Sequence, residues 1–147
     1  MTHILGVSAG FHDAAVSIIS DNGDIIFAAH SERYSKKKND ANLCSELVQE
    51  LYGIDFHTIA YYEKPWLKQL RQVYSGQGIE YDKLTTRQIL QKQLRPFLMN
   101  GSKIKNYSHH LSHAAAGFQT SPYDRATVVV IDAIGEWDTI SIWGAEY

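Results

Sequence analysis

The sequence predicts an α/β fold in which helices cover a mixed β-sheet. Three consecutive segments, residues 4–8, 14–20 and 25–30, are short and rich in β-branched and small residues, as strands are. The pair Asn22-Gly23 between the second and third favours a tight hairpin, because both residues tolerate positive φ. Helical and strand-like segments then alternate along the chain, a pattern typical of a sheet flanked by helices.

Periodicity and turn residues predict the other elements. Residues 32–40 are polar and without periodicity, which indicates an exposed loop, whereas residues 43–51 have helical spacing and Gly53 stands where that helix should end. The further predicted strands are residues 58–62, 103–107, 126–131 (as a buried strand) and 139–145, and the further predicted helices are residues 66–99, with a break near 75–78, and 110–118.

Composition limits the class of protein. With 147 residues, 44% of them hydrophobic and 20% charged, the chain can bury a globular core. Its net charge of −2 argues against non-specific nucleic-acid binding, and the single cysteine, Cys44, excludes an internal disulfide. No apolar run approaches the roughly 20 residues of a membrane-spanning helix. We therefore expect a soluble, cytoplasmic protein without a membrane or nucleic-acid partner.

Three of the seven histidines lie within five positions, at His109, His110 and His113. On a helix, His109 and His113 share one face about 6 Å apart along the axis, where two imidazoles can bind one metal ion, while His110 points about 100° away. The glutamate that zinc proteases carry between such histidines is absent, which argues against a protease. The alternative is that these are ordinary surface or capping histidines.

Asp132 is the candidate third ligand. It follows an apolar strand-like run and precedes a glycine-containing turn. Ligands of α/β sheets gather at the carboxyl ends of strands, so this position favours chemistry, although an aspartate that closes a strand by forming a turn is common. Two histidines and a carboxylate with open coordination positions suit iron(II) or another divalent metal, including zinc and manganese.

Two further groups of polar residues precede the histidines. His12 and Asp13 lie in a glycine-bearing loop that can present backbone N–H groups to a phosphate, and His12 can exchange a proton near neutral pH. We treat both as catalytic candidates; the alternative is a hairpin turn stabilised by an Asx hydrogen bond. Arg33 and Lys36 belong to a basic segment that is either a solvated loop or an anion-steering surface.

Four ordered blocks of the chain resemble the O-carbamoyltransferases that modify nodulation factors and antibiotics. The blocks are residues 4–8 with 12–15, 32–37, 109–115 and 132–137. The resemblance implies a ribonuclease-H-like, actin-like ATPase fold, related to the enzymes that transfer threonylcarbamoyl to tRNA. It also implies that residues 1–147 form the first lobe of a bilobal transfer domain, without the second lobe, its additional aspartate ligand and the adenylate-forming domain.

The family's reaction implies roles for the residues. A separate domain converts carbamoyl phosphate and ATP to carbamoyl adenylate, and the transfer domain passes the carbamoyl group to an acceptor hydroxyl of a sugar or natural product. The implied metal ligands, of an iron-type ion, are His109, His113 and Asp132, and the implied catalytic residues are His12 and Asp13. The expected substrate-binding residues are Arg33, Lys36, Gly135 and Glu136. Ala133 stands where the family usually has glycine, so the turn there should differ.

Two alternatives stay open. A sugar kinase or actin-like ATPase would use the same sheet, but the loop at residues 10–13 is not the acidic or glycine-rich phosphate loop that those proteins usually carry. A non-catalytic binding module would tolerate replacement of His109 and His113. Because the second lobe and the adenylate-forming domain are missing, we expect the 147-residue chain alone to be inactive in carbamoyl transfer.

Overall fold

A five-stranded mixed sheet forms the centre of the computed structural model, which describes residues 3–11, 13–99 and 101–147. Its strand order is β3-β2-β1-β4-β5. β1 pairs antiparallel with β2, and β2 with β3, while β1–β4 and β4–β5 are parallel. The strands are β1 (His3–Ser8), β2 (Ala15–Ser20), β3 (Ile25–His30), β4 (Phe56–Tyr61) and β5 (Lys103–Asn106). The three predicted antiparallel strands and the mixed sheet are confirmed.

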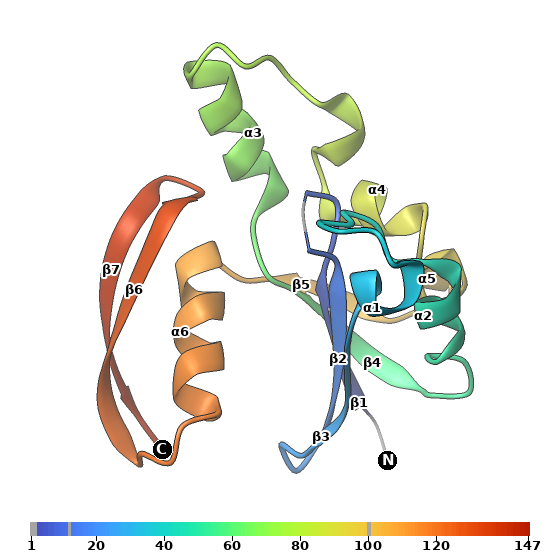
Figure 1. Cartoon of the computed structure of the whole chain (residues 1–147), viewed down its shortest axis with the longest axis horizontal. Coiled ribbons are helices and arrows are strands. Elements are labelled where there is room, and N and C mark those ends of the chain that lie inside the picture. Colours follow the sequence, from blue (N-terminus) through green and yellow to red (C-terminus); the bar gives the residue numbers. More distant parts are fainter. Residues whose placement is uncertain (1–2, 12, 100) are drawn as a thin grey trace.

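Helices lie in the connections that follow β3, β4 and β5 (Figure 1). They are α1 (Ser31–Ser35), α2 (Ser45–Gln49), α3 (Pro65–Tyr74), the 3₁₀ helix η1 (Tyr81–Lys83), α4 (Thr86–Gln91), α5 (Arg95–Met99) and α6 (His109–Gln119). The helix α1 shows that the predicted loop over residues 32–40 was wrong for residues 32–35, whereas residues 36–40 form neither helix nor strand, as predicted. Tertiary contacts decide this point: the buried Ser31 hydroxyl donates to the carbonyl of Asn42 and accepts from the amide of Cys44, and Lys36 ends the helix with a φ of 57°.

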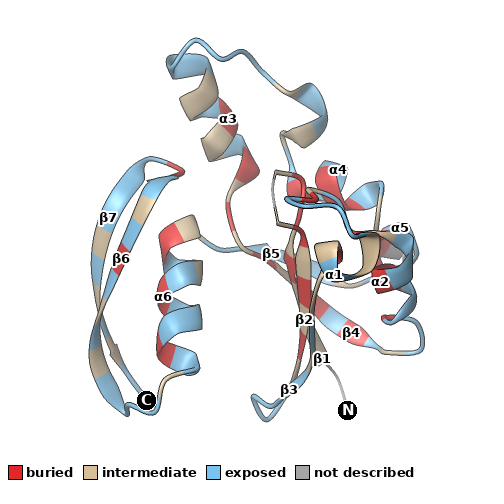
Figure 2. Ribbon diagram, in the orientation of Figure 1, coloured by how far each residue is buried: buried red, intermediate tan, exposed pale blue. Residues whose placement is uncertain are grey.

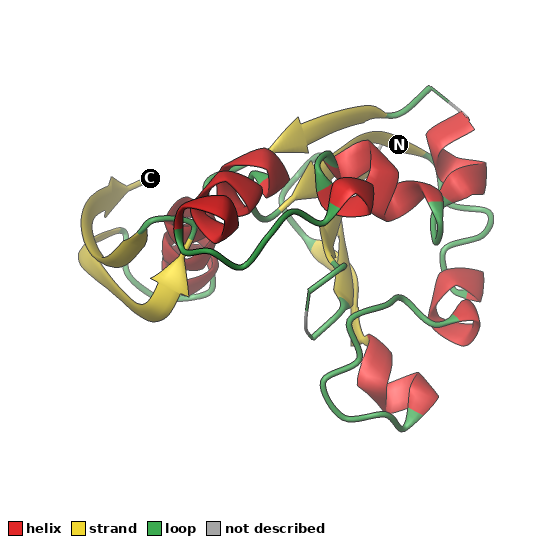
Figure 3. Ribbon diagram, turned by 90° about the horizontal axis from the view of Figure 1, so that it is seen from above, coloured by secondary structure: helices red, strands yellow, loops and turns green. Residues whose placement is uncertain are grey.

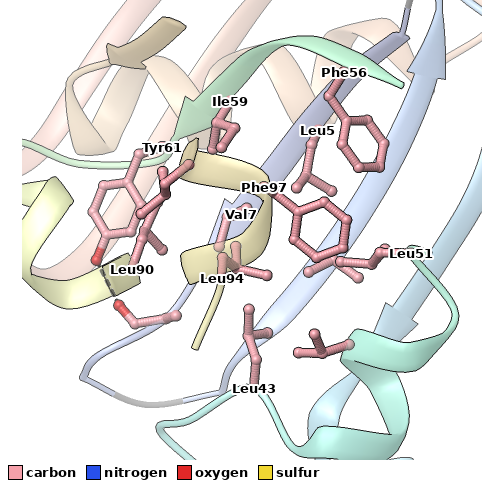
Figure 4. Packing of buried hydrophobic residues seen from close by; sticks show 14 of the residues in the cluster. Leu5, Val7, Leu43, Leu51, Phe56, Ile59, Tyr61, Leu90, Leu94 and Phe97 are labelled. Atoms are coloured by element: carbon pink, nitrogen blue, oxygen red, sulfur yellow. Dashed lines mark hydrogen bonds between the residues drawn. The ribbon is translucent and has the colours of Figure 1, made fainter. Parts of the chain in front are cut away.

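The hydrophobic core lies between the central sheet and the helices α2, α4 and α5 (Figure 4). Leu5, Ile59 and Leu90 are fully buried there. Tyr61 joins them, and its hydroxyl donates a hydrogen bond to the carbonyl of Ala9, which satisfies the polar end of the ring. Figure 2 shows buried residues gathered along β1, β2 and β4 and on these helices.

Gly10, in the loop that follows β1, packs closely against this core. Its φ is +94°, and a Cβ at this position would lie 2.7 Å from Cγ2 of Ile89. We predict that Gly10→Ala lowers the free energy of unfolding by about 1–3 kcal/mol through backbone strain and by a further amount of about 1–3 kcal/mol through the clash. Gly23→Ala is the control in urea denaturation, because Gly23 has a φ of +89° but open space around it. If both variants lost the same free energy of unfolding, the predicted clash with Ile89 would be contradicted.

The last two strands form a separate two-stranded sheet. β6 (Arg125–Gly135) and β7 (Asp138–Glu146) make an antiparallel hairpin that packs against α6. Figure 1 shows α6 between the hairpin and the central sheet, and Figure 3 shows the hairpin at one end of the molecule.

The prediction that residues 126–131 form a buried strand was therefore wrong for one face. Val130 is 7% exposed, but Val129 and Ile131 are 54% and 76% exposed. An unbroken Val/Ile run indicates a strand covered on both faces, whereas the outer face of this hairpin is open among the described residues. No helix in the described part of the chain has the length and apolar character needed to cross a membrane.

Candidate metal centre

The three predicted ligands meet at one point. Nε2 of His109 lies 2.8 Å from Oδ2 of Asp132 and 3.0 Å from Nε2 of His113. One ligand atom from each residue lies within 4.8 Å of the others. Metal–imidazole bonds are about 2.0–2.1 Å, so nitrogens that share an ion are roughly 3 Å apart. The donor set and its spacing fit a divalent ion with open coordination positions.

Helix α6 and the hairpin bring these side chains together. α6 begins at His109, so His113 lies one turn further along the same face, as the spacing predicted. Asp132 belongs to β6, which continues past it to Gly135, although the predicted strand ended at Ile131. The strand register shifts between Ile131 and Gly135, and the amide of Ala133 donates to Oδ1 of Asp132 at 2.7 Å. Asp132 therefore occupies a strand irregularity and not a strand end.

Gly135 and Glu136 complete the hairpin's contact with the helices. A Cβ on Gly135 would lie 2.8 Å from Cδ2 of His110 and 3.0 Å from Cγ of His109, so the glycine makes room for both rings. Glu136 has a φ of 54° and is 7% exposed. Its Oε1 accepts a 2.6 Å hydrogen bond from the amide of Lys64, which ties the hairpin turn to the start of α3.

A cleft of about 740 Å³ opens in front of the three ligands. Asp13 lines it together with Glu136. His12, the other predicted catalytic residue, lies outside the described residues. The predicted substrate-binding residues Arg33 and Lys36 are not among those that line the cleft. Both are exposed, and Nζ of Lys36 donates to the carbonyl of Arg33 at 2.7 Å, so their predicted role stays a prediction.

Residues 68–146 match the family model of the carbamoyltransferase N-terminus. The chain belongs to this family. The match contains His109, His113 and Asp132, and it confirms the resemblance that the sequence motifs indicated. The other two resembling blocks, within residues 4–15 and 32–37, precede the matched range.

Two relatives align with most of this carbamoyltransferase-family chain. The uncharacterized protein sll1178 of Synechocystis sp. is 33% identical over 175 aligned residues, which cover 99% of this chain. The nodulation protein NolNO of Sinorhizobium fredii is 30% identical over 138 residues, which cover 86% of this chain. The alignments span 28% and 20% of these two relatives.

Three charged residues of the cleft were not predicted from the sequence. Glu63, at the connection between β4 and α3, is 1% exposed, and its Oε2 lies 3.5 Å from Nδ1 of His109. Lys68 and Arg71 extend from α3 into the same cleft. Glu63 is 46 positions before His109 and belongs to no motif, so only the pairing of the strands reveals their contact. For Lys68 and Arg71, the sequence shows nothing beyond helical spacing that would indicate a place in the cleft.

The pKa values of His109 and His113 are shifted in opposite directions. The Glu63 carboxylate raises the pKa of His109 above its usual value against the opposing effect of burial. Burial and the neighbouring His109 lower the pKa of His113. Partial burial opposes ionisation of Asp132, but the amide of Ala133 and the charge of His109 outweigh it and lower its pKa. Asp132 and His113 therefore favour the ionised carboxylate and the neutral imidazole that bind metals, whereas His109 holds its second proton more tightly and must release it when a metal binds.

Proposed function

We propose that this chain is part of an O-carbamoyltransferase, which moves a carbamoyl group from carbamoyl adenylate to an acceptor hydroxyl of a sugar or natural product. The adenylate would be made from carbamoyl phosphate and ATP elsewhere in the same protein. The observation that carries the proposal is the convergence of His109, His113 and Asp132 beside a cleft, within the range that matches the carbamoyltransferase family. Relatives that are several times longer support a larger parent protein.

A divalent metal, iron(II) in our proposal, would be held by His109, His113 and Asp132. When bound, it would act as a Lewis acid that polarises a carbamoyl or phosphate oxygen of the donor. The chain's own contribution is to fix three donor atoms within 4.8 Å of one another and to leave the remaining coordination positions open to the cleft. Zinc and manganese accept the same donor types.

The other predicted residues receive roles around this centre. His12 would orient or deprotonate the acceptor hydroxyl, which suits an imidazole near neutral pH. Asp13, which lines the cleft, would assist it. Gly135 and Glu136 would shape the donor site from the hairpin turn, whereas Arg33 and Lys36 would bind substrate from outside the cleft.

We also propose the ribonuclease-H-like, actin-like fold for this chain. The strand order, with two antiparallel hairpin connections followed by two parallel strands, supports it. A second antiparallel hairpin, β6–β7, repeats the β1–β2 arrangement later in the chain. This repetition supports a domain that is built from two related lobes.

The proposal is tested on the full-length parent by measuring pyrophosphate released from ATP with and without carbamoyl phosphate. We expect release to depend on carbamoyl phosphate. We expect His113→Ala to keep this release but to lose carbamoyl transfer, and His57→Ala, an exposed histidine of β4, to keep both. Release without carbamoyl phosphate would instead favour the kinase-like alternative, and transfer by His113→Ala would remove the metal centre from the reaction. The 147-residue chain alone should show neither activity.

A further inference from the structure

Glu63 is a buried carboxylate behind the candidate metal ligands. It is 1% exposed and lies two residues after the end of β4 and two residues before the start of α3. Its Oε2 lies 3.5 Å from Nδ1 of His109, the ring nitrogen opposite the one that faces Asp132 and His113. Nδ1 is buried and has no hydrogen-bond partner among the described residues.

The backbone around Glu63 is held from three sides. The hydroxyl of Ser112 in α6 donates to the carbonyl of Tyr62 at 2.8 Å. The side-chain amide of Asn106, at the end of β5, donates to the carbonyl of Glu63 at 3.2 Å. The amide of Lys64 donates to Glu136 in the hairpin turn, as described above. Glu63 is therefore fixed relative to the helix that carries both histidines and to the hairpin that carries Asp132.

Lys68 balances part of the carboxylate's charge. Its Nζ lies 3.4 Å from both carboxylate oxygens and 3.4 Å from the centre of the Phe11 ring. A buried carboxylate needs such a partner, because an unpaired buried charge is strongly destabilising. The ion pair with Lys68 still leaves Oε2 of Glu63 facing Nδ1 of His109.

We propose that Glu63 is a positioning residue that accepts a hydrogen bond from Nδ1–H of His109. This bond fixes the tautomer in which Nε2 carries the lone pair, and it holds the ring toward Asp132 and His113. Metal-binding histidines usually donate their second ring N–H to a carboxylate or carbonyl in this way. The separation of 3.5 Å shortens to an ordinary hydrogen bond of about 2.9 Å with a small ring movement. The inference rests on the proposed metal centre.

The test is metal affinity, measured by titrating the purified metal-free protein with Co²⁺ or Zn²⁺. Loss of such an orienting partner typically weakens metal binding about 10–100-fold; because Glu63→Gln removes the charge but keeps an amide oxygen that can accept a hydrogen bond, we expect a loss of about tenfold, at the lower end of this range. Glu80→Gln is the matched control, because it removes an outlying carboxylate that is paired with Lys83 at 2.7 Å, and it should bind as the wild type does. In the zinc-bound wild type, ¹⁵N NMR should show the proton of His109 on Nδ1.

Two further variants separate orientation from folding. Glu63→Gln leaves Lys68 without its partner, so the double variant Glu63→Gln/Lys68→Met removes the whole ion pair and keeps the buried region uncharged. We expect it to fold and still to bind metal weakly. Wild-type affinity in this double variant, while His113→Ala has lost binding, would overturn the role of Glu63 and leave the metal centre standing. A wild-type protein that binds neither ion would overturn both the centre and this inference.

Discussion

Replacing His109 by alanine should weaken metal binding by more than about a hundredfold, beyond the range known for residues that only support a ligand. Nε2 of His109 would be the central donor of the proposed centre, because it lies 2.8 Å from the Asp132 carboxylate and 3.0 Å from the His113 ring. Its loss leaves one imidazole and one carboxylate on separate elements, and no third donor replaces it in the described cluster. The measurement is metal content after dialysis, followed by titration of the metal-free protein.

The neighbouring histidine provides the contrast for His109→Ala. His110 is 3% exposed, and its Nδ1 lies 2.7 Å from the hydroxyl of Ser141 in β7, away from the metal ligands. We expect His110→Ala to lower the thermal stability of the contact between α6 and the hairpin while the protein still binds metal. If His110→Ala lost the metal and His109→Ala kept it, the assignment of ligands would be wrong.

The proximity of the two histidine side chains could be predicted because it depends on short-range geometry. Two histidines four positions apart must share a face once the segment is helical, and α6 is helical over that range. The position of Asp132 next to a strand could be predicted from the sequence. The register shift between Ile131 and Gly135 could not. That shift depends on the pairing of β6 with β7 and on the contact between Gly135 and the histidine rings, which no local pattern specifies.

Features that depend on contacts between distant segments were missed. Glu63 reaches His109 only because β4 and β5 lie side by side and deliver the segments that follow them to one edge of the sheet. The five-residue helix α1 has too few positions to show a period, and the burial of Ser31 supports it.

Gly135→Ala should disrupt the proposed metal centre although it replaces none of the three candidate ligands. The added methyl group would meet the rings of His109 and His110, and the backbone on both sides is held by strand pairing and by the Glu136–Lys64 hydrogen bond. The rings or the hairpin must therefore move. We expect the free energy of unfolding to fall by about 1–3 kcal/mol, as in other overpacked sites. Metal affinity should fall at least about tenfold, because the His109 ring is displaced from Asp132.

The second strand glycine of the hairpin makes this prediction specific. Gly144, in β7, has no atom within 4 Å of the position its Cβ would take, and neither it nor Gly135 has a positive φ. Gly144→Ala therefore introduces the same chemical change in the same hairpin without the contact to the histidines, and it should retain both stability and metal affinity. If the two variants bound metal equally well, the hairpin turn would be loose enough to accept a side chain, and the close contact of Gly135 with the histidines would not be what holds Asp132 against His109.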